Sequence, residues 1–212
     1  MRIHDSETAY NLKKKPIEES LIALLWNKIR PSLKYVPALS VFFIAIFFLT
    51  SKTDTLNTKI GEEKVYTLTD GSKIYLNSVS SLIVDKDYNL VNRKVELKGE
   101  AYFEVEKGTL PFIIKTEYGE VTVLGTSFNL KNRSESFELG VTSGSVNFTS
   151  KVKSYNLEKG QELQISENYL NRNRLKKTYT DYPSWRYNKV FCDEKSLKQI
   201  SLELERKFDI SF

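Results

Sequence analysis

The residue types that most often carry out chemistry in proteins are scarce in this sequence. It contains one histidine, His4, and one cysteine, Cys192. These numbers exclude an internal disulfide, a cysteine-cluster zinc site, a histidine-based metal centre, and a Ser-His or Cys-His catalytic pair within the chain. The sequence therefore predicts a protein that is not an enzyme and that carries no cofactor.

Two further patterns that carry chemistry in other proteins are incomplete here. Glu100 and Glu104 form a carboxylate pair, but four residues separate them in a predicted strand, which is about 13 Å and exceeds both spacings of glycoside hydrolases. The segment 123–127 (VLGTS) lacks the lysine of a phosphate-binding loop, and no helical pattern follows it. A cell-wall enzyme is therefore the least favoured function class.

The composition and the charge indicate how the chain is organised. With 40% hydrophobic residues among 212, the chain can fold as one medium domain or two small ones. Residues 1–52 hold eight Lys or Arg and four Asp or Glu, whereas residues 53–212 hold 24 and 23, so the net charge of +5 belongs mainly to the N-terminal part. The main body is therefore not expected to bind nucleic acid.

An apolar run divides the basic N-terminal part from the body. Residues 35–51 are 17 consecutive uncharged residues between Lys34 and Lys52. This length is at the lower limit for a transmembrane helix, and the long lysine side chains can reach the lipid headgroups. Because more Lys and Arg precede the run than follow it, the sequence predicts a single-pass protein with a cytoplasmic N-terminus and an external C-terminal body. A cleaved signal peptide is less favoured because 34 residues precede the run.

Residues 1–34 are predicted to form a short cytoplasmic arm that contains a helix. Its apolar residues fall on one helical stripe: Ile17, Leu21, Leu24, Leu25 and Ile29. So short an arm cannot bury this stripe alone, so the stripe lies on the membrane, continues into the spanning helix, or docks on a partner protein. Trp26 beside Lys28 and Arg30 favours the membrane surface.

After a linker at 52–61, residues 62–176 have the alternating pattern of an all-β domain. Roughly ten short strands are expected, which suits a sandwich, a barrel or a solenoid. Asp70-Gly71 is a hairpin dipeptide, and Lys98-Gly99-Glu100 reads as a break between strands. Gly125 is interpreted as a bulge or sharp bend, that is, a bulged or positive-φ conformation.

A second linker, 177–184, precedes a segment in which the pattern changes again. Trp185 and Val190-Phe191 predict a strand, and residues 209–212 return to alternation. Between them lies a helical stripe: Leu197, Ile200, Leu204 and Phe208. Residues 185–212 are thus expected to begin a βαβ unit whose second strand is only started, and this unit must either dock on the β domain or remain incomplete.

Several ordered motifs between residues 60 and 212 resemble the FecR family of single-pass anti-sigma regulators, especially its Bacteroidetes type. They are LTDGSKIYLN at 68–77, RKVELKGEAYFEV at 93–105, PFIIKT at 111–116, VTVLGTSFNL at 121–130, VTSGSV at 141–146, LEKGQEL at 157–163 and the stretch 185–212. The residues that carry this resemblance as structural motifs are Asp70, Gly71, Gly99, Glu100, Gly125, Thr126, Phe128, Gly144, Gly160 and Trp185.

The resemblance implies an inner-membrane protein with a periplasmic β-rich (sandwich- or solenoid-like) ectodomain and a C-terminal unit similar to the short βαβ domains of secretins and TonB receptors. It implies two partners: an extracytoplasmic-function (ECF) sigma factor in the cytoplasm, and the signalling domain of a TonB-dependent outer-membrane transducer. Residues of the arm are the expected sigma contacts: Leu21, Leu24, Leu25 and Trp26. The stripe of the C-terminal helix is the expected transducer contact: Leu197, Ile200, Leu204 and Phe208.

This sequence departs from the family pattern at both ends, since the family usually has a longer cytoplasmic region and a longer C-terminal domain. Two alternatives to the anti-sigma relay therefore stay open. One is a membrane-anchored β scaffold or adhesion module that does not bind a sigma factor. The other is a truncated paralogue without function.

Overall fold

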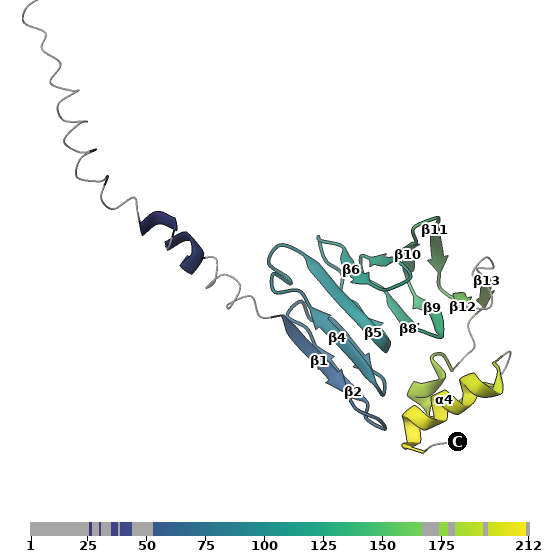
Figure 1. Cartoon of the computed structure of the whole chain (residues 1–212). Coiled ribbons are helices and arrows are strands. Elements are labelled where there is room, and N and C mark those ends of the chain that lie inside the picture. Colours follow the sequence, from purple (N-terminus) through teal and green to yellow (C-terminus); the bar gives the residue numbers. More distant parts are fainter. Residues whose placement is uncertain are drawn as a thin grey trace, which may run out of the picture. The chain divides into compact units, whose positions relative to one another are not determined.

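The structure, a computed structural model, describes residues 26, 30, 35–37, 39–43, 53–166, 174–177, 181–192 and 195–210. The chain divides into two units, Met1–Lys52 and Thr53–Phe212. In the first unit, residues 36–37 and 39–43 are helical, while the rest of the span predicted at 35–51 lies outside the described residues (Figure 1). Among the described residues, no helix combines the length and the apolar character needed to cross a membrane.

The second unit is mainly β, as the sequence predicts, and its described residues form thirteen strands, one short 3-10 helix and one α-helix (Figure 1). The strands are β1 (Asp54–Thr58), β2 (Lys64–Thr67), β3 (Lys73–Leu76), β4 (Ser80–Val84), β5 (Arg93–Glu104), β6 (Phe112–Lys115), β7 (Glu120–Val123), β8 (Ser127–Arg133), β9 (Ser136–Ser143), β10 (Ser145–Thr149), β11 (Ser154–Glu158), β12 (Gln161–Ser166) and β13 (Arg174–Lys177). The helices are η3 (Ser184–Tyr187) and α4 (Leu197–Phe208).

The long strand β5 belongs to two sheets and joins them. Its first half pairs antiparallel with β4 and parallel with β6, and its second half pairs antiparallel with β3 and β8. One sheet therefore has the order β1-β4-β5-β6-β7-β10-β11, and the other has the order β2-β3-β5-β8-β9-β12-β13. Through β5 the two sheets form one continuous, nearly closed sheet around a single core.

Gly99 is the residue at which β5 passes from one sheet to the other. The break predicted at 98–100 is wrong, because the strand continues through Gly99 with a φ of +104°. A Cβ at this position would lie 2.4 Å from Ser80 Oγ, so a larger residue has no room. The same hydroxyl accepts a hydrogen bond from the backbone N–H of Glu100 at 2.9 Å. Glycine bends this strand instead of ending it.

The core consists of the inward-facing residues of both sheets. Its largest fully buried side chains are Phe103, Phe112, Phe128, Phe137 and Phe148. The ring centroids of Phe103 and Phe128, from adjacent strands, are 5.1 Å apart in a stacked arrangement. Burial of each side chain of this kind stabilises the folded state by about 1.5–3 kcal/mol. Because successive side chains of a strand point to opposite faces, the apolar residues at every second position form the inner face.

The C-terminal segment differs in part from the strand–helix–strand unit that the sequence predicts. The helix is confirmed, and Ser196 caps it with a reciprocal Ser196–Gln199 capping box. The strand predicted around Trp185 is wrong, since that residue lies in η3, and described residues 188–192 form no strand. Pro183 precedes η3 and the left-handed Asn188 ends it, so the backbone turns where the alternating pattern suggested extension.

Candidate functional site

The outward face of the second sheet carries a polar row beneath the C-terminal segment. The register places Lys131 of β8 between Glu100 of β5 and Glu138 of β9, and Gln164 of β12 beside Glu138. Their strand neighbours Ala101, Leu130 and Leu139 point into the core. Alternation therefore sends the polar side chains outward, where the remainder of the chain covers them.

A second row on the same face receives an aromatic side chain from the C-terminal segment. Asn129 and Gly140 are register partners in this row. The ring of Tyr182 lies on Gly140, because a Cβ there would be 2.3 Å from the Tyr182 hydroxyl. That hydroxyl donates to Glu138 Oε1 at 3.1 Å. Gly140 thus makes the flat contact that lets Tyr182 reach the polar row.

The 3-10 helix η3 anchors the segment further. Trp185 Nε1 donates to Asn129 Oδ1 at 3.1 Å. The guanidinium of Arg186 lies 3.9 Å and 4.3 Å from the ring centroids of Tyr75 and Tyr102. These distances are within the range of cation–π contacts, which stabilise most when they are shielded from water.

Helix α4 docks on the β domain through charged residues. Glu203 accepts hydrogen bonds from Lys131 at 2.5 Å and from Lys195 at 2.8 Å and 3.0 Å. Arg206 pairs with Glu135 at 2.6 Å. The backbone N–H of Gly61 also donates to the carbonyl of Arg206 at 2.8 Å. The docked face of α4 is therefore polar.

The apolar stripe of α4 is exposed only at its two ends. Leu197 and Phe208 are 85% and 57% exposed, and Ile200 and Leu204 are half-buried. None of the twelve residues of the helix is buried. The structure thus exposes the two ends of the stripe that the sequence assigns to a transducer contact, and it half-buries the two residues in the middle.

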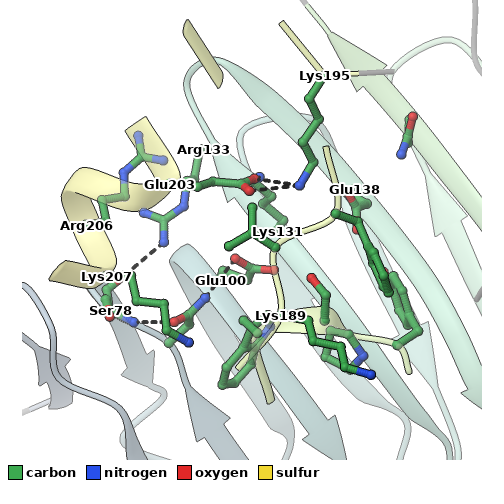
Figure 2. Close-up of a pocket in the computed structure, with 18 of the residues that line it drawn as sticks. Ser78, Glu100, Lys131, Arg133, Glu138, Lys189, Lys195, Glu203, Arg206 and Lys207 are labelled. Carbon is green, nitrogen blue, oxygen red and sulfur yellow. Dashed lines mark hydrogen bonds and ion pairs between the residues drawn. The ribbon is translucent and has the colours of Figure 1, made fainter. Parts of the chain in front are cut away.

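Between the polar rows, the segment 182–191 and α4 lies a cavity of about 90 Å³ (Figure 2). Burial raises the pKa of Glu138, and the nearby Glu100 adds to this effect while Lys131 opposes it. For Glu203, burial favours the neutral acid, but Lys131 and Lys195 outweigh it and lower the pKa. The cavity is therefore a place where opposite charges are held away from water, an arrangement that often marks a functional site.

The motif residue Asp70 belongs to a different cluster. Its carboxylate accepts hydrogen bonds from Ser72, from the hydroxyl of Tyr88 at 2.8 Å and from Arg93 at 3.0 Å. The Asp70 and Arg93 side chains are only 6% and 3% exposed. Arg93 also donates to the carbonyls of Glu106 and Leu110, so this ion pair connects four chain segments.

The remaining motif residues occupy structural positions. Gly71, Gly144 and Gly160 have positive φ angles in the short connections between consecutive strands. Thr126 Oγ1 donates to the carbonyl of Ser145 at 2.9 Å, and Phe128 is in the core. Gly125 lies in the bend between β7 and β8, but its φ is not positive. Glycine is needed here because a Cβ at position 125 would lie 2.4 Å from Lys107 Cγ.

Of the residues proposed to bind a sigma factor, Leu21, Leu24 and Leu25 lie outside the described residues. Trp26 is described and is 59% exposed. Glu100 and Glu104, the carboxylate pair in the sequence, both have structural partners: Asn77 and Asn129 donate to Glu100, and Tyr75 donates to Glu104. In the described part of the chain, no three His, Cys, Asp or Glu side chains are grouped so as to hold a metal ion.

Of the ten residues named as structural motifs, only Glu100 and Trp185 line the cavity. Lys131, Glu138, Tyr182 and Glu203 are missed because each looks like an ordinary solvent-facing residue in its own segment. The available signal was the run of polar residues at outward positions on three strands that become neighbours only in the sheet.

Comparison with known proteins agrees with the fold. Residues 54–147 match the family model described as FecR protein. Two crystal structures, at 2.50 and 1.65 Å resolution, of a protein from Parabacteroides distasonis ATCC 8503 described as a candidate anti-sigma factor are similar to this chain. Both are 25% identical and cover 74% of this chain, with 76% and 75% of the other chain covered and TM-scores of 0.70 and 0.69. No curated protein sequence matches the chain significantly.

Proposed function

We propose that this protein is an anti-sigma regulator, and more specifically a single-pass inner-membrane relay, because residues 54–147 match the FecR family model. In this role its periplasmic part receives a signal from an outer-membrane TonB-dependent transducer, and its cytoplasmic arm controls an ECF sigma factor. The observation that carries the proposal is the family match together with two similar structures described as candidate anti-sigma factors.

A relay of this kind needs no catalytic group, but it needs two states that a partner can distinguish. The contacts between α4 and the β domain are suited to such a change, because they are polar and partly exposed to water. The Arg206–Glu135 ion pair, whose side chains are 21% and 24% exposed, can exchange for water-mediated contacts, whereas a buried apolar interface would not. The C-terminal segment is thus the part of the second unit that a partner can rearrange most easily.

The exposed ends of the apolar stripe of α4 support the transducer contact. Leu197 and Phe208 lie at opposite ends of the helix and expose most of their apolar surface. An apolar helix face of this kind is a common docking surface for another protein. In our proposal the signalling domain of the transducer covers this stripe.

Sigma binding by the arm is the decisive test. A fusion protein that carries residues 1–34 should retain a co-expressed ECF sigma factor of the same cell during purification. Leu24→Asp together with Leu25→Asp should abolish this retention, because the changes place two charges on the apolar stripe of the predicted helix. Ala23→Asp, which introduces the same group on another face, is the control and should bind normally. Failure of the unaltered arm to bind would favour the membrane-anchored scaffold.

The topology is tested separately. Alkaline phosphatase fused after Gln164 should be active if the body lies in the periplasm, and a β-galactosidase fusion at the same point should be inactive. The opposite pair of results would refute the proposed orientation.

A further inference from the structure

Most charged side chains on the wall of the cavity have a partner of opposite charge. Glu203 pairs with Lys131 and Lys195, and the remaining pairs are Arg206–Glu135, Lys207–Glu63 and Lys189–Asp181. Arg133, Glu138 and Glu100, in contrast, form no ion pair with any residue that the structure describes. Glu100 accepts hydrogen bonds at both carboxylate oxygens, from Asn77 and Asn129. Arg133 donates to the backbone carbonyls of Ser78 at 2.9 Å and Val79 at 3.1 Å. Glu138 accepts from the Tyr182 hydroxyl.

A hydroxyl without a partner lies at the arginine end of the same cavity. Ser78 is 3% exposed and lines the cavity, and its Oγ has no hydrogen-bond partner in the structure. A buried polar atom of this kind costs free energy unless a group in the cavity satisfies it. The hydroxyl can donate to an anion that is also held by Arg133.

Arg133 and Glu138 lie at opposite ends of the cavity. Lys131 and Glu138 are register partners, and Arg133 is two residues further along β8, so the Cα atoms of Arg133 and Glu138 are about 8 Å apart. Arg133 reaches away from Glu138 toward the chain after β3, which increases the separation between the charged groups. Figure 2 shows Ser78, Arg206 and Lys207 on one side and Glu138 on the other.

We propose that this cavity binds a short zwitterion, with its ammonium group at Glu138 and its carboxylate at Arg133 and the Ser78 hydroxyl. Charge-assisted hydrogen bonds at both ends would supply the missing partners, and guanidinium–carboxylate geometry permits two parallel bonds at the arginine. The cavity volume of about 90 Å³ has room for roughly seven waters, which fits a ligand of dipeptide or ω-amino-acid size. An α-amino acid holds its two charges too close together to reach both ends.

The bound ligand would join the β domain to the C-terminal segment. Arg133 and Glu138 come from β8 and β9, whereas Tyr182, Arg206 and Lys207 on the same wall come from the C-terminal segment. Occupancy should therefore stabilise the docked position of this segment. This inference does not depend on sigma or transducer binding. The ligand proposal can therefore fail while the proposed function holds, and the proposed function can fail while the ligand proposal holds.

The test is a titration calorimetry series with the full-length chain in detergent micelles. The probes are glycine, 4-aminobutyrate, 6-aminohexanoate and glycylglycine, with butylamine and butyrate as ligands that carry one charge. We expect a longer zwitterion to bind at least about tenfold more tightly than glycine and than either single-charge ligand. Absence of binding by all four zwitterions, or equal binding by butylamine or butyrate, would overturn the proposal.

Variants then locate the site. Glu138→Gln and Arg133→Gln remove one charge each with little change in size, and each should weaken binding at least about tenfold. Ser78→Ala should weaken binding less and serves as a second reporter of the arginine end. Lys151→Gln, an exposed change in the turn between β10 and β11, is the matched control and should bind like the unaltered chain. Far-ultraviolet circular dichroism verifies that each variant is folded, and unchanged binding in folded Glu138→Gln would contradict the assignment.

Discussion

The buried ion pair between Asp70 and Arg93 should be a principal determinant of the stability of the β domain. Arg93→Met removes the guanidinium but keeps an apolar side chain of similar length. The change leaves the Asp70 carboxylate, which is 6% exposed, without its cation. It also removes the hydrogen bonds that Arg93 donates to the carbonyls of Glu106 and Leu110 at 2.6–2.9 Å in the unaltered protein. Loss of one partner of a buried pair costs about 3–5 kcal/mol, and we expect a loss in this range.

The assay is urea denaturation of the unit Thr53–Phe212, followed by circular dichroism. Asp70→Asn alone should lose about 1.5–3 kcal/mol, the value of a hydrogen bond to a charged group. The double variant should lose less than the sum of the two single losses, by about 1 kcal/mol or more, because both act on one interaction. Glu96→Gln, which breaks the exposed pair of Glu96 with Lys98, is the control and should change stability by less than about 0.5 kcal/mol. Additive losses, or a loss below about 1 kcal/mol for Arg93→Met, would refute the proposed role of the pair.

The same pair predicts a pH dependence. Burial opposes the charge of Asp70, but hydrogen bonds from Ser72, Tyr88 and Arg93 outweigh it and lower the pKa below the ordinary value of 3.8. The folded state therefore gains stability from this carboxylate above pH 3.8, and it loses that gain as the pH falls below 3.8 through the folded pKa. The stability difference between the unaltered protein and Asp70→Asn should shrink over this range. A constant difference down to pH 2.5 would contradict the cause given.

Three further outcomes can be measured. Gly125→Ala should cost about 1–3 kcal/mol in urea denaturation, because the added Cβ meets Lys107, and a cost below about 0.5 kcal/mol would show that this neighbour moves aside. Gly140→Ala should displace Tyr182 from the sheet and make the C-terminal segment more sensitive to limited proteolysis, whereas an unchanged digestion pattern would show that the aromatic contact does not hold the segment. The amides of 197–208 should exchange faster than those of the core strands in the free protein and become protected when a transducer signalling domain is added; fast exchange in both states would remove the evidence for this partner.

The part of the fold that follows from local pattern was predictable from the sequence. Alternation of apolar and polar residues predicts the mainly β domain, and the spacing of Leu197, Ile200, Leu204 and Phe208 predicts α4. Asp70-Gly71 marks the β2–β3 hairpin because the required backbone conformation depends on the residues in the turn itself. The scarcity of histidine and cysteine limits the possible chemistry without any structure.

The candidate site was not predictable in the same way, because contacts between distant residues create it. A period of two assigns Lys131 and Glu138 to a face of a strand, but it does not say which strands are neighbours or in what register. Helical spacing likewise defines the apolar stripe of α4, yet only the position of Lys131 on β8 and of Glu135 in the β8–β9 turn decides that the charged face docks. The ends of the stripe, Leu197 and Phe208, stay exposed. The sequence by itself thus determined the elements and their faces, because these depend on neighbours in the chain, whereas the tertiary structure decided which faces meet and where charges remain unpaired, because these depend on long-range packing.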